Sequence, residues 1–421
     1  MPRAAAGGSS RILVLSIYHD PEPIPKTGEL ARELQRRGHD VTVVTAFPHY
    51  PSGDLYPGYR LALWRWEIRD GVRILRTFIV PYHGTRGSLR ILNYLSWMIS
   101  SIQAAWLAPA CDVMYVWHPP LTVGVSAWII ARLKRVRYVY DVQDLWPESA
   151  LASGLLRPGA LVNTLHRLAD WVYARAPRIL VVSEAAKEEI RRRGVDPAKI
   201  SVAPHWIDTT PFARATFRDI RAEFGWLGRF VVMFAGNLGM VQGLETVIDA
   251  AARLRDRDDV LVVFVGDGSD RARLESMVSD QRLTNVVFAG RHPADQMPDF
   301  FRAADALVVH LRPSDIADHA VPTKILAYLA SGRPVICATS GASAELVQIA
   351  GAGLVCPPGD PKALAEAIAE LASLPEDARA ALGERGRSYL EAHFEKRRVI
   401  DGYERLLDRL AHERSRDRRG A

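Results

Sequence analysis

The strongest constraint on the fold is a pattern that occurs twice along the chain: an apolar strand, a loop, a helix and a second apolar strand. RILVLSI (11–17) is a continuous apolar run, ELARELQRR (29–37) has its apolar residues on one helical face, and DVTVVTAF (40–47) is apolar again. Continuous apolar runs are typical of strands covered on both faces, as in parallel sheets. The segment is therefore predicted to be a βαβ unit with a right-handed crossover.

The same order restarts near residue 229 with RFVVMFAG, the loop NLGMVQG, the helix LETVIDAAARLRDR and the strand DVLVVFVGDG. This predicts an α/β chain with two Rossmann-like, doubly wound parallel-sheet domains that face each other across a cleft. The remaining strands are expected at 112–117, 137–142, 178–183, 285–290, 306–311, 333–338 and 353–357. The predicted parts are a first domain at 1–205, a second domain at 206–395, and a solvent-facing C-terminal helix with a charged tail at 396–421.

Length and composition agree with two soluble domains. The chain has 421 residues, 48% hydrophobic and 24% charged, which is enough for two separate cores. Its three cysteines are far apart, which argues against a disulfide framework or a zinc site and favours a reducing compartment. The first residues contain no apolar run of signal-peptide length, so a cytoplasmic location is expected.

Glycine-rich loops follow two strands of the second half. Small residues in AGNLGMVQG (235–243) let backbone N–H groups approach an anion at a helix start. The loop matches neither the Walker A nor the dinucleotide fingerprint, and a purely structural turn explains it equally well. In VGDGSD (265–270), Asp267 or Asp270 is expected to cap the next helix. In AGRHP (289–293), Arg291 or His292 could contact the edge of a ligand base.

A second anion-binding signal precedes the helix VPTKILAYLASG (321–332). Arg312, His319 and Lys324 are three candidate cations near one helix start. Full positive charges together with a helix N-terminus suit a diphosphate. The alternative is a solvated loop with Thr323 as the cap.

Polar residues also follow the strands of the first half. YHDPEPIPKTGE contains His19, Asp20, Glu22 and Glu29, and YDVQDLWPES contains Asp141, Asp144 and Glu148. Carboxylates at strand ends could bind a hydroxyl-rich substrate, although a single one is more often a helix cap. No protease-like triad and no metal-binding motif stands out.

The first half is basic and rich in tryptophan. Residues 1–205 hold 26 Lys/Arg against 17 Asp/Glu, whereas the remainder holds 28 against 31. Different partners for the two halves would account for this difference, and surface solubility alone is the alternative. Within 60–106, arginines alternate with tryptophans, which favours contact with an anionic membrane surface; a buried helix with a basic rim is the alternative. Nucleic-acid binding is not favoured, because no recognition motif is present. The residues in question are Trp64, Trp66, Trp97, Trp106, Arg60, Arg65, Arg69, Arg73, Arg76, Arg86 and Arg90.

Taken together, these segments resemble retaining, nucleotide-sugar-dependent glycosyltransferases of family 4, which have the GT-B fold. The resemblance covers roughly residues 11–410 and is nearest to bacterial transferases that build colanic acid, O-antigen and other surface polysaccharides, including fucose and N-acetylfucosamine transferases. It rests on GELARELQRRGHDVTVVTAFPHYP, VQDLWPES, AGNLGMVQGLE, VFVGDGSDRARLE and VPTKILAYLASGRPVI. The series is specific for the fold and for sugar transfer, but not for the sugar.

Several positions depart from the family pattern. Asn237 and Gln242 stand where the family commonly has Arg and Lys in the glycine loop, and His319 and Ala327 stand where it often has two glutamates. Gln143 replaces a histidine that often precedes the aspartate of the first-half motif. Arg312 and Lys324 are then the remaining candidates to balance the charge of the donor diphosphate.

The resemblance implies a metal-independent transferase whose co-substrate is a UDP- or GDP-type sugar, with no cofactor. It assigns acceptor binding to the domain at 1–205 and donor binding to the domain at 206–395. The acceptor would be a lipid-linked, polyprenyl-diphosphate saccharide at the inner face of the plasma membrane. Lys324, Arg312 and His319 are assigned to catalysis and His19, Asp20, Asp144 and Glu148 to the acceptor. The donor-binding residues are Gly236, Asn237, Gly239, Gln242, Gly266, Arg291, Pro322, Thr323 and Glu345. The alternatives are a nucleotide-sugar 2-epimerase and a weakly active binding or partner subunit.

Overall fold

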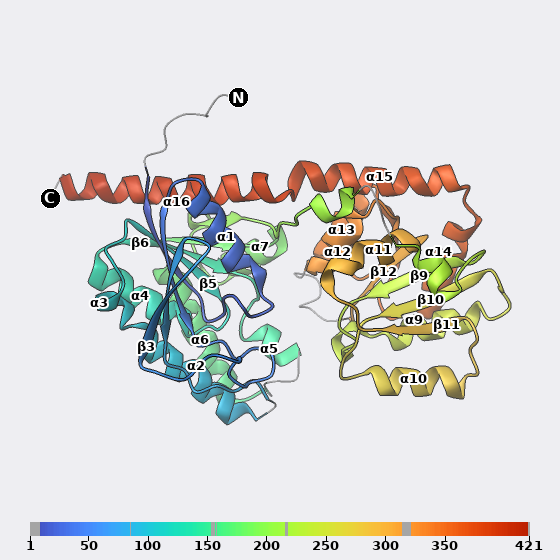
Figure 1. Cartoon of the computed structure of the whole chain (residues 1–421), viewed down its shortest axis with the longest axis horizontal. Helices are drawn as coiled ribbons and strands as arrows, with labels where there is room; N and C mark the ends of the chain where they lie inside the picture. The colour runs from blue at the N-terminus through green and yellow to red at the C-terminus, as the bar shows by residue number, and fades with distance from the viewer. Residues whose placement is uncertain are drawn as a thin grey trace. The chain divides into compact units, whose positions relative to one another are not determined.

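The computed structural model describes residues 9–84, 86–152, 156, 158–214, 218–313 and 321–419. The chain divides into two compact units (Figure 1). Unit 1 consists of Met1–Ala203 and Ile400–Ala421, and unit 2 consists of Pro204–Val399. The prediction of two Rossmann-like α/β halves is confirmed, and each half is described by itself.

Unit 1 is built on an eight-stranded sheet with the strand order β3-β4-β2-β1-β5-β6-β7-β8. Only the pair β3–β4 is antiparallel. In β1, β2 and β5 consecutive residues are buried, which shows that helices cover both faces. The strands are β1 (Arg11–Leu15), β2 (Asp40–Ala46), β3 (Trp64–Arg69), β4 (Val72–Thr77), β5 (Val113–His118), β6 (Arg137–Val142), β7 (Arg178–Val181) and β8 (Ile200–Val202). The helices are α1 (Pro25–Arg36), α2 (Gly87–Ser101), α3 (Ala104–Leu107), α4 (Val123–Lys134), α5 (Glu148–Ala152), α6 (Ala160–Arg175), α7 (Glu184–Arg192) and η1 (Pro197–Lys199).

The hairpin of β3 and β4 was not predicted. Its register pairs Arg69 with Val72, so that Asp70 and Gly71 form a two-residue turn. Both turn residues have positive φ, 51° and 79°, as such turns require. As the edge strand, β3 leaves Trp64 and much of its length exposed.

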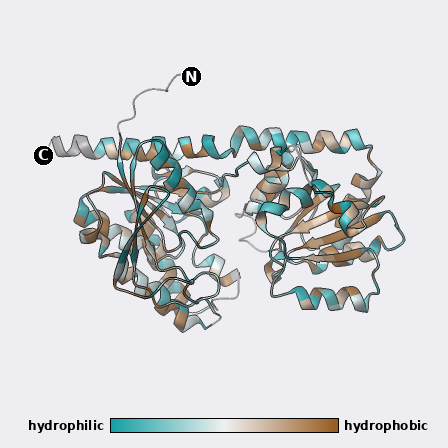
Figure 2. Ribbon diagram, in the orientation of Figure 1, coloured by the Kyte–Doolittle hydropathy of each residue, from teal (hydrophilic) through white to brown (hydrophobic). Residues whose placement is uncertain are grey.

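Unit 2 is built on a six-stranded, fully parallel sheet with the order β11-β10-β9-β12-β13-β14. Alternate residues of β9 belong to different cores: Val231 and Met233 lie in one and Val232 and Phe234 in the other. Both faces of the sheet are therefore covered, and its strands are among the most hydrophobic segments (Figure 2). The strands are β9 (Phe230–Ala235), β10 (Val260–Val265), β11 (Val286–Gly290), β12 (Ala306–His310), β13 (Val335–Ala338) and β14 (Gly353–Val355). The helices are η2 (Thr210–Ala213), α8 (Ile220–Phe224), η3 (Met240–Gln242), α9 (Glu245–Arg253), α10 (Arg271–Asp280), η4 (Ala294–Gln296), α11 (Met297–Ala303), α12 (Thr323–Ala330), α13 (Gly341–Ala350), α14 (Pro361–Ser373) and α15 (Glu376–His393).

The C-terminal helix α16 (Lys396–Arg419) corrects the prediction of a separate, solvent-facing tail. From Ile400 onward the helix belongs to unit 1. Tyr403, Leu407 and Leu410 are buried there, and the Tyr403 hydroxyl donates to Asp141 at 3.1 Å. Residues 396–421 include many charged residues, but apolar residues recur among them at helical spacing and pack against unit 1.

Candidate functional site

The carboxyl ends of four neighbouring strands in unit 2 bring the predicted donor segments to one edge of the sheet. Because β11, β10, β9 and β12 are adjacent and parallel, the loops that follow them lie side by side. These loops contain the glycine loop, the Gly-Asp-Gly segment, Arg291 and Arg312. This is the edge at which open α/β sheets bind ligands.

Two glycines allow the backbones of neighbouring loops to approach closely. Gly236 and Gly266 have φ of 141° and 140°, and a Cβ on Gly266 would lie 1.9 Å from the carbonyl oxygen of Gly236. A side chain at either position would therefore strain or block the site. The close approach leaves exposed backbone at the strand ends, as an anion-binding loop requires.

His310 holds the glycine loop in place through a hydrogen bond and was not among the predicted site residues. Its Nδ1 lies 2.6 Å from the carbonyl oxygen of Gln242, and its Nε2 accepts from the Gly359 N–H at 3.3 Å. The second contact assigns the ring proton to Nδ1, which therefore donates to Gln242. Burial lowers the pKa of His310, so the ring is neutral and acts as a brace.

Lys324, on the first turn of α12, directs its ammonium into the glycine loop. Its Nζ donates to Gln242 Oε1 at 2.7 Å and lies 4.0 Å from the centroid of the Phe234 ring. A Cβ on Gly236 would be 3.1 Å from the same nitrogen. Burial lowers the pKa of Lys324 to about 7. The loop, which has a glutamine at position 242, thus receives its positive charge from the helix.

Arg312 lies beside the same loop but is already engaged. Its Nη2 and Nε donate to Glu245 Oε1 at 2.6 and 3.1 Å. Glu245 also pairs with Arg273 at 2.9 Å. Arg312 is therefore held in a network of surface ion pairs, whereas no carboxylate of the described residues pairs with Lys324.

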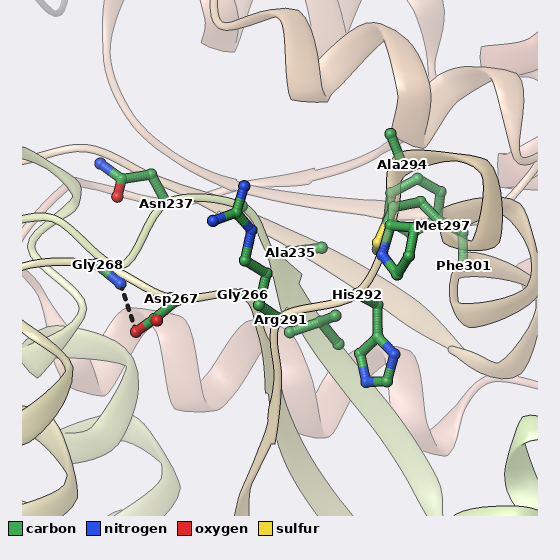
Figure 3. Close-up of a pocket in the computed structure, with 13 residues that line it drawn as sticks. Ala235, Asn237, Gly266, Asp267, Gly268, Arg291, His292, Ala294, Met297 and Phe301 are labelled. Atoms are coloured by element: carbon green, nitrogen blue, oxygen red, sulfur yellow. Dashed lines mark hydrogen bonds between the residues drawn. The ribbon is translucent and has the colours of Figure 1, made fainter. Parts of the chain in front are cut away.

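A pocket of about 930 Å³ lies over the ends of β9, β10 and β11. Figure 3 shows Arg291 between Asn237 on one side and a group formed by Ala294, Met297 and Phe301 on the other. The polar side offers the backbone of Gly236 and Gly266 and the carboxylate of Asp267, while the other side is apolar apart from His292. Such a pocket suits a ligand with an anionic end and a flat apolar end. Arg291 is a predicted donor-binding residue, whereas Met297, Phe301 and Asp267 were not predicted to bind the donor.

The other predicted donor residues are less central. Pro322 and Thr323 begin α12, and Thr323 makes no side-chain cap. Glu345 is exposed on α13 and does not line the pocket. Asp270 stands at the start of α10 but bonds Arg273 rather than capping the helix. His319 lies outside the described residues.

In unit 1, three of the four predicted acceptor residues have protein partners. His19 is buried, and burial lowers its pKa to about 4. Asp20 forms an ion pair with Arg32, and Glu148 forms one with Arg193. Asp144 remains exposed.

Two buried carboxylates organise the same strand ends. Glu22 accepts from the backbone N–H groups of His19, His49 and Tyr50 at 2.9 to 3.0 Å. It thereby links the loops after β1 and β2. Asp141 accepts from Tyr403, and Lys26 lies 3.3 Å away.

The structure also contains one group of metal-compatible side chains among the described residues. Ligand atoms of His39, Glu404 and Asp408 lie within 4.8 Å of one another. Glu404 is held by Arg37, and Asp408 accepts from Ser10. His39 directly precedes β2, at the opposite edge from the strand ends described above.

Two protein-family models match the chain. "Glycosyl transferase 4-like domain" matches residues 24–206, and "Glycosyl transferases group 1" matches residues 229–373. The two matches fall on units 1 and 2 respectively.

Among curated proteins, the chain is similar to a colanic acid biosynthesis glycosyl transferase named WcaI from Escherichia coli K12. The two are 28% identical over 411 residues, which is 93% of this chain and 98% of that protein. A glycosyltransferase named WbjE from Pseudomonas aeruginosa is 27% identical over 247 residues, 56% of this chain and 60% of that one.

Solved structures share the fold. HepE of Anabaena in complex with UDP matches with a TM-score of 0.69 and 19% identity, covering 94% of this chain and 99% of that one. Sucrose-phosphate synthase of Thermosynechococcus elongatus matches with a TM-score of 0.73 and 18% identity, covering 95% and 99%. The predicted GT-B fold is thereby confirmed.

Proposed function

The chain belongs to the group 1 glycosyltransferases with the GT-B fold, and we propose that it moves a sugar from a nucleotide-diphosphate sugar to a polyprenyl-diphosphate-linked glycan during bacterial surface-polysaccharide synthesis. The similarity to WcaI over 93% of the chain supports this setting. One structural observation carries the donor half of the proposal: the Lys324 ammonium lies 2.7 Å from Gln242 within the glycine loop.

The pocket of unit 2 is the proposed donor site. Its apolar side, with Met297 and Phe301, would take the base, and its glycine side would take the diphosphate. Lys324 then supplies the charge that the loop lacks, because Asn237 and Gln242 are neutral. UDP is the natural first probe, since HepE has been solved with UDP and with UDP-glucose.

The chemistry follows from where charge develops. The bond between the sugar C1 and the phosphate oxygen breaks, and the acceptor hydroxyl oxygen bonds to C1. The acceptor proton passes to the leaving phosphate oxygen, so no protein carboxylate is needed as base, and attack on the same face retains configuration. Lys324 and the backbone N–H groups of the glycine loop stabilise the developing diphosphate charge. Arg312 lies beside the loop and would add a second positive charge if its ion pair with Glu245 broke.

The acceptor is assigned to unit 1, with Asp144 as the exposed carboxylate at a strand end. Peripheral contact of unit 1 with an anionic membrane is part of the proposal. Trp64, Trp66 and Trp106 are exposed near arginines, whereas Trp97 and Arg76 are fully buried and are withdrawn from the predicted surface. Arg76 instead pairs with Glu67 at 2.6 Å. Of the helices in the described part of the chain, none is both long and apolar enough to cross a bilayer.

The assignment of Lys324 to the donor diphosphate is tested by moving its positive charge from α12 to position 242 in the glycine loop. Lys324→Gln should weaken UDP binding by about tenfold to a hundredfold in calorimetry, the usual effect of losing a charge-assisted hydrogen bond. The double variant Lys324→Gln with Gln242→Lys should recover much of the affinity, because a lysine at 242 brings an ammonium back to the loop. Lys362→Gln, an exposed lysine on α14, is the matched control. Unchanged UDP affinity in Lys324→Gln would refute the assignment.

Turnover assays separate the proposed activity from its alternatives. Transfer releases nucleoside diphosphate only when a lipid-linked acceptor is present. Interconversion of the nucleotide sugar without acceptor would instead indicate an epimerase. Donor binding with no turnover against a panel of acceptors would indicate a partner subunit.

A further inference from the structure

An arginine and several aromatic rings gather at the carboxyl edge of the sheet in unit 1, close in sequence to the carboxylates described above. Each residue follows a different strand or lies on the first turns of α2, so the topology brings together side chains that are far apart in sequence. We call this set the Arg90 cluster. It consists of Tyr18 after β1, Tyr50 after β2, His83 after β4, Arg90 and Tyr94 on α2, and Trp146 after β6.

Ring contacts and one hydrogen bond join the members of the cluster in two groups, Arg90 with Tyr94 and Trp146, and Tyr50 with Tyr18 and His83. The Arg90 Nη2 donates to the Tyr94 hydroxyl at 3.1 Å, and the Tyr94 and Trp146 rings lie edge to face at 6.2 Å. Tyr50 contacts both Tyr18 and His83, with ring centroids 5.0 and 4.6 Å apart. All except Tyr18 are only partly buried, so the cluster presents a surface to a ligand.

The cluster has one unbalanced charge. Among the described residues no carboxylate lies within ion-pair distance of Arg90, whose guanidinium donates to the Tyr94 hydroxyl. Burial and then the charge of Arg90 lower the pKa of His83 to about 4, so His83 is neutral at physiological pH. A partly buried guanidinium whose remaining N–H groups have no acceptor is a favourable site for a phosphate.

The same helix offers an apolar surface beside this charge. Ile91, Leu95 and Ile99 follow one another at helical spacing along α2 and are exposed, together with Leu92. Arg90 and Tyr94, one turn apart, border this stripe. A molecule that fits both features carries a phosphate next to a long apolar chain.

We propose that the Arg90 cluster is the acceptor's phosphate subsite, in which Arg90 and Tyr94 bind the phosphate of a polyprenyl-linked acceptor while its isoprenoid chain lies along the exposed stripe of α2. The aromatic rings of Tyr50 and Trp146 then flank the first sugar. This inference rests on the proposed function, because it names the acceptor-binding residues of that activity.

The test measures binding without turnover. Full-length protein is titrated with nanodiscs of neutral phosphatidylcholine that contain polyprenyl phosphate, and with nanodiscs that contain the same molar fraction of phosphatidylglycerol. The wild type should bind nanodiscs with polyprenyl phosphate more tightly than nanodiscs with phosphatidylglycerol. Arg90→Gln should bind the polyprenyl phosphate nanodiscs about tenfold more weakly than the wild type does, and should no longer prefer them. Tyr94→Phe should lose less, and Arg86→Gln, an exposed arginine at the start of the same helix, should keep the preference.

Three outcomes would overturn the inference: equal binding of both nanodiscs by the wild type, unchanged preference in Arg90→Gln, or an equal loss in Arg86→Gln. UDP affinity separates this inference from the donor proposal, because Arg90 lies in unit 1. Arg90→Gln should bind UDP as the wild type does. A protein that binds polyprenyl phosphate through Arg90 but never binds UDP would leave the subsite standing and remove the proposed activity.

Discussion

Lys324 shows how a helix can bring a positive charge to a neighbouring loop. The glycine loop has neutral side chains at Asn237 and Gln242, yet an ammonium lies 2.7 Å from Gln242 Oε1. The same burial that places this group in the loop makes its charge costly while the site is empty, since the pKa is lowered to about 7. A bound diphosphate would remove that cost.

This predicts a pH-dependent affinity. Unliganded Lys324 is charged below about pH 7 and loses its proton above it, whereas the diphosphate-bound form keeps the proton. Binding above pH 7 therefore takes up a proton, and UDP affinity should fall from pH 7 to 9 with a slope approaching tenfold per pH unit. The terminal phosphate of UDP titrates near pH 6 and does not contribute in this range.

Calorimetry in two buffers with different ionisation enthalpies measures the proton uptake directly. Lys324→Gln should show neither the uptake nor the slope. Equal slopes in the wild type and in this variant would contradict the assignment.

Residues of the candidate site differ in how far the sequence could predict them. Gly236, Gly266 and Lys324 follow strands or begin a helix, so local pattern was sufficient to find them. His310 acts through partners that only the fold brings near, since it bonds a loop 68 residues earlier. The ion pairs of Asp20 with Arg32 and of Glu148 with Arg193 could not be predicted either, because the sequence does not distinguish a free carboxylate at a strand end from a paired one.

At the scale of elements, apolar periodicity predicted most strands of both sheets but not the β3–β4 hairpin. The first of its strands, WRWEIR, combines Trp, Arg and Ile, which suggested an interfacial surface rather than a sheet edge. The Asp70-Gly71 pair between them is a recognised signal for a two-residue turn and would have identified it. Helix α16 was misjudged for a related reason: its buried residues are few among many charges, and the surface they cover lies in unit 1, far away in sequence.

Helix α16 should therefore contribute strongly to the stability of unit 1. Leu407 is 1% exposed, and Leu407→Ala should lower the free energy of unfolding by about 2–5 kcal/mol. Tryptophan fluorescence during urea unfolding reports mainly this unit, which contains eight of the ten tryptophans. Leu133→Ala, an exposed leucine of α4, should change the transition little.

UDP affinity should be unchanged in Leu407→Ala at low urea, since the proposed donor pocket lies in unit 2. A fluorescence transition at the wild-type urea concentration would show that α16 does not stabilise the unit. Loss of UDP binding would show that the helix supports both units.

At the scale of the whole molecule, charge and exposed apolar surface are concentrated in the first half. Residues 1–205 carry an excess of nine positive charges, and the remainder an excess of three negative ones. Ile68 on β3 and Ile99 on α2 are 76% and 65% exposed, and both lie within the arginine-rich segment. Basic and apolar residues together favour binding to an anionic membrane surface.

We therefore expect the protein to sediment with vesicles that contain phosphatidylglycerol, less with pure phosphatidylcholine, and less at high salt because screening weakens the arginine contribution. Ile68→Ser and Ile99→Ser should each reduce binding by about tenfold, since each removes apolar surface that would enter the membrane. Leu227→Ser is the matched control, because Leu227 is similarly exposed but lies in unit 2. If Leu227→Ser weakens binding as much as the other two, or if the wild type ignores anionic vesicles at low salt, the first half does not bind membranes in this way, and its charge serves solubility instead.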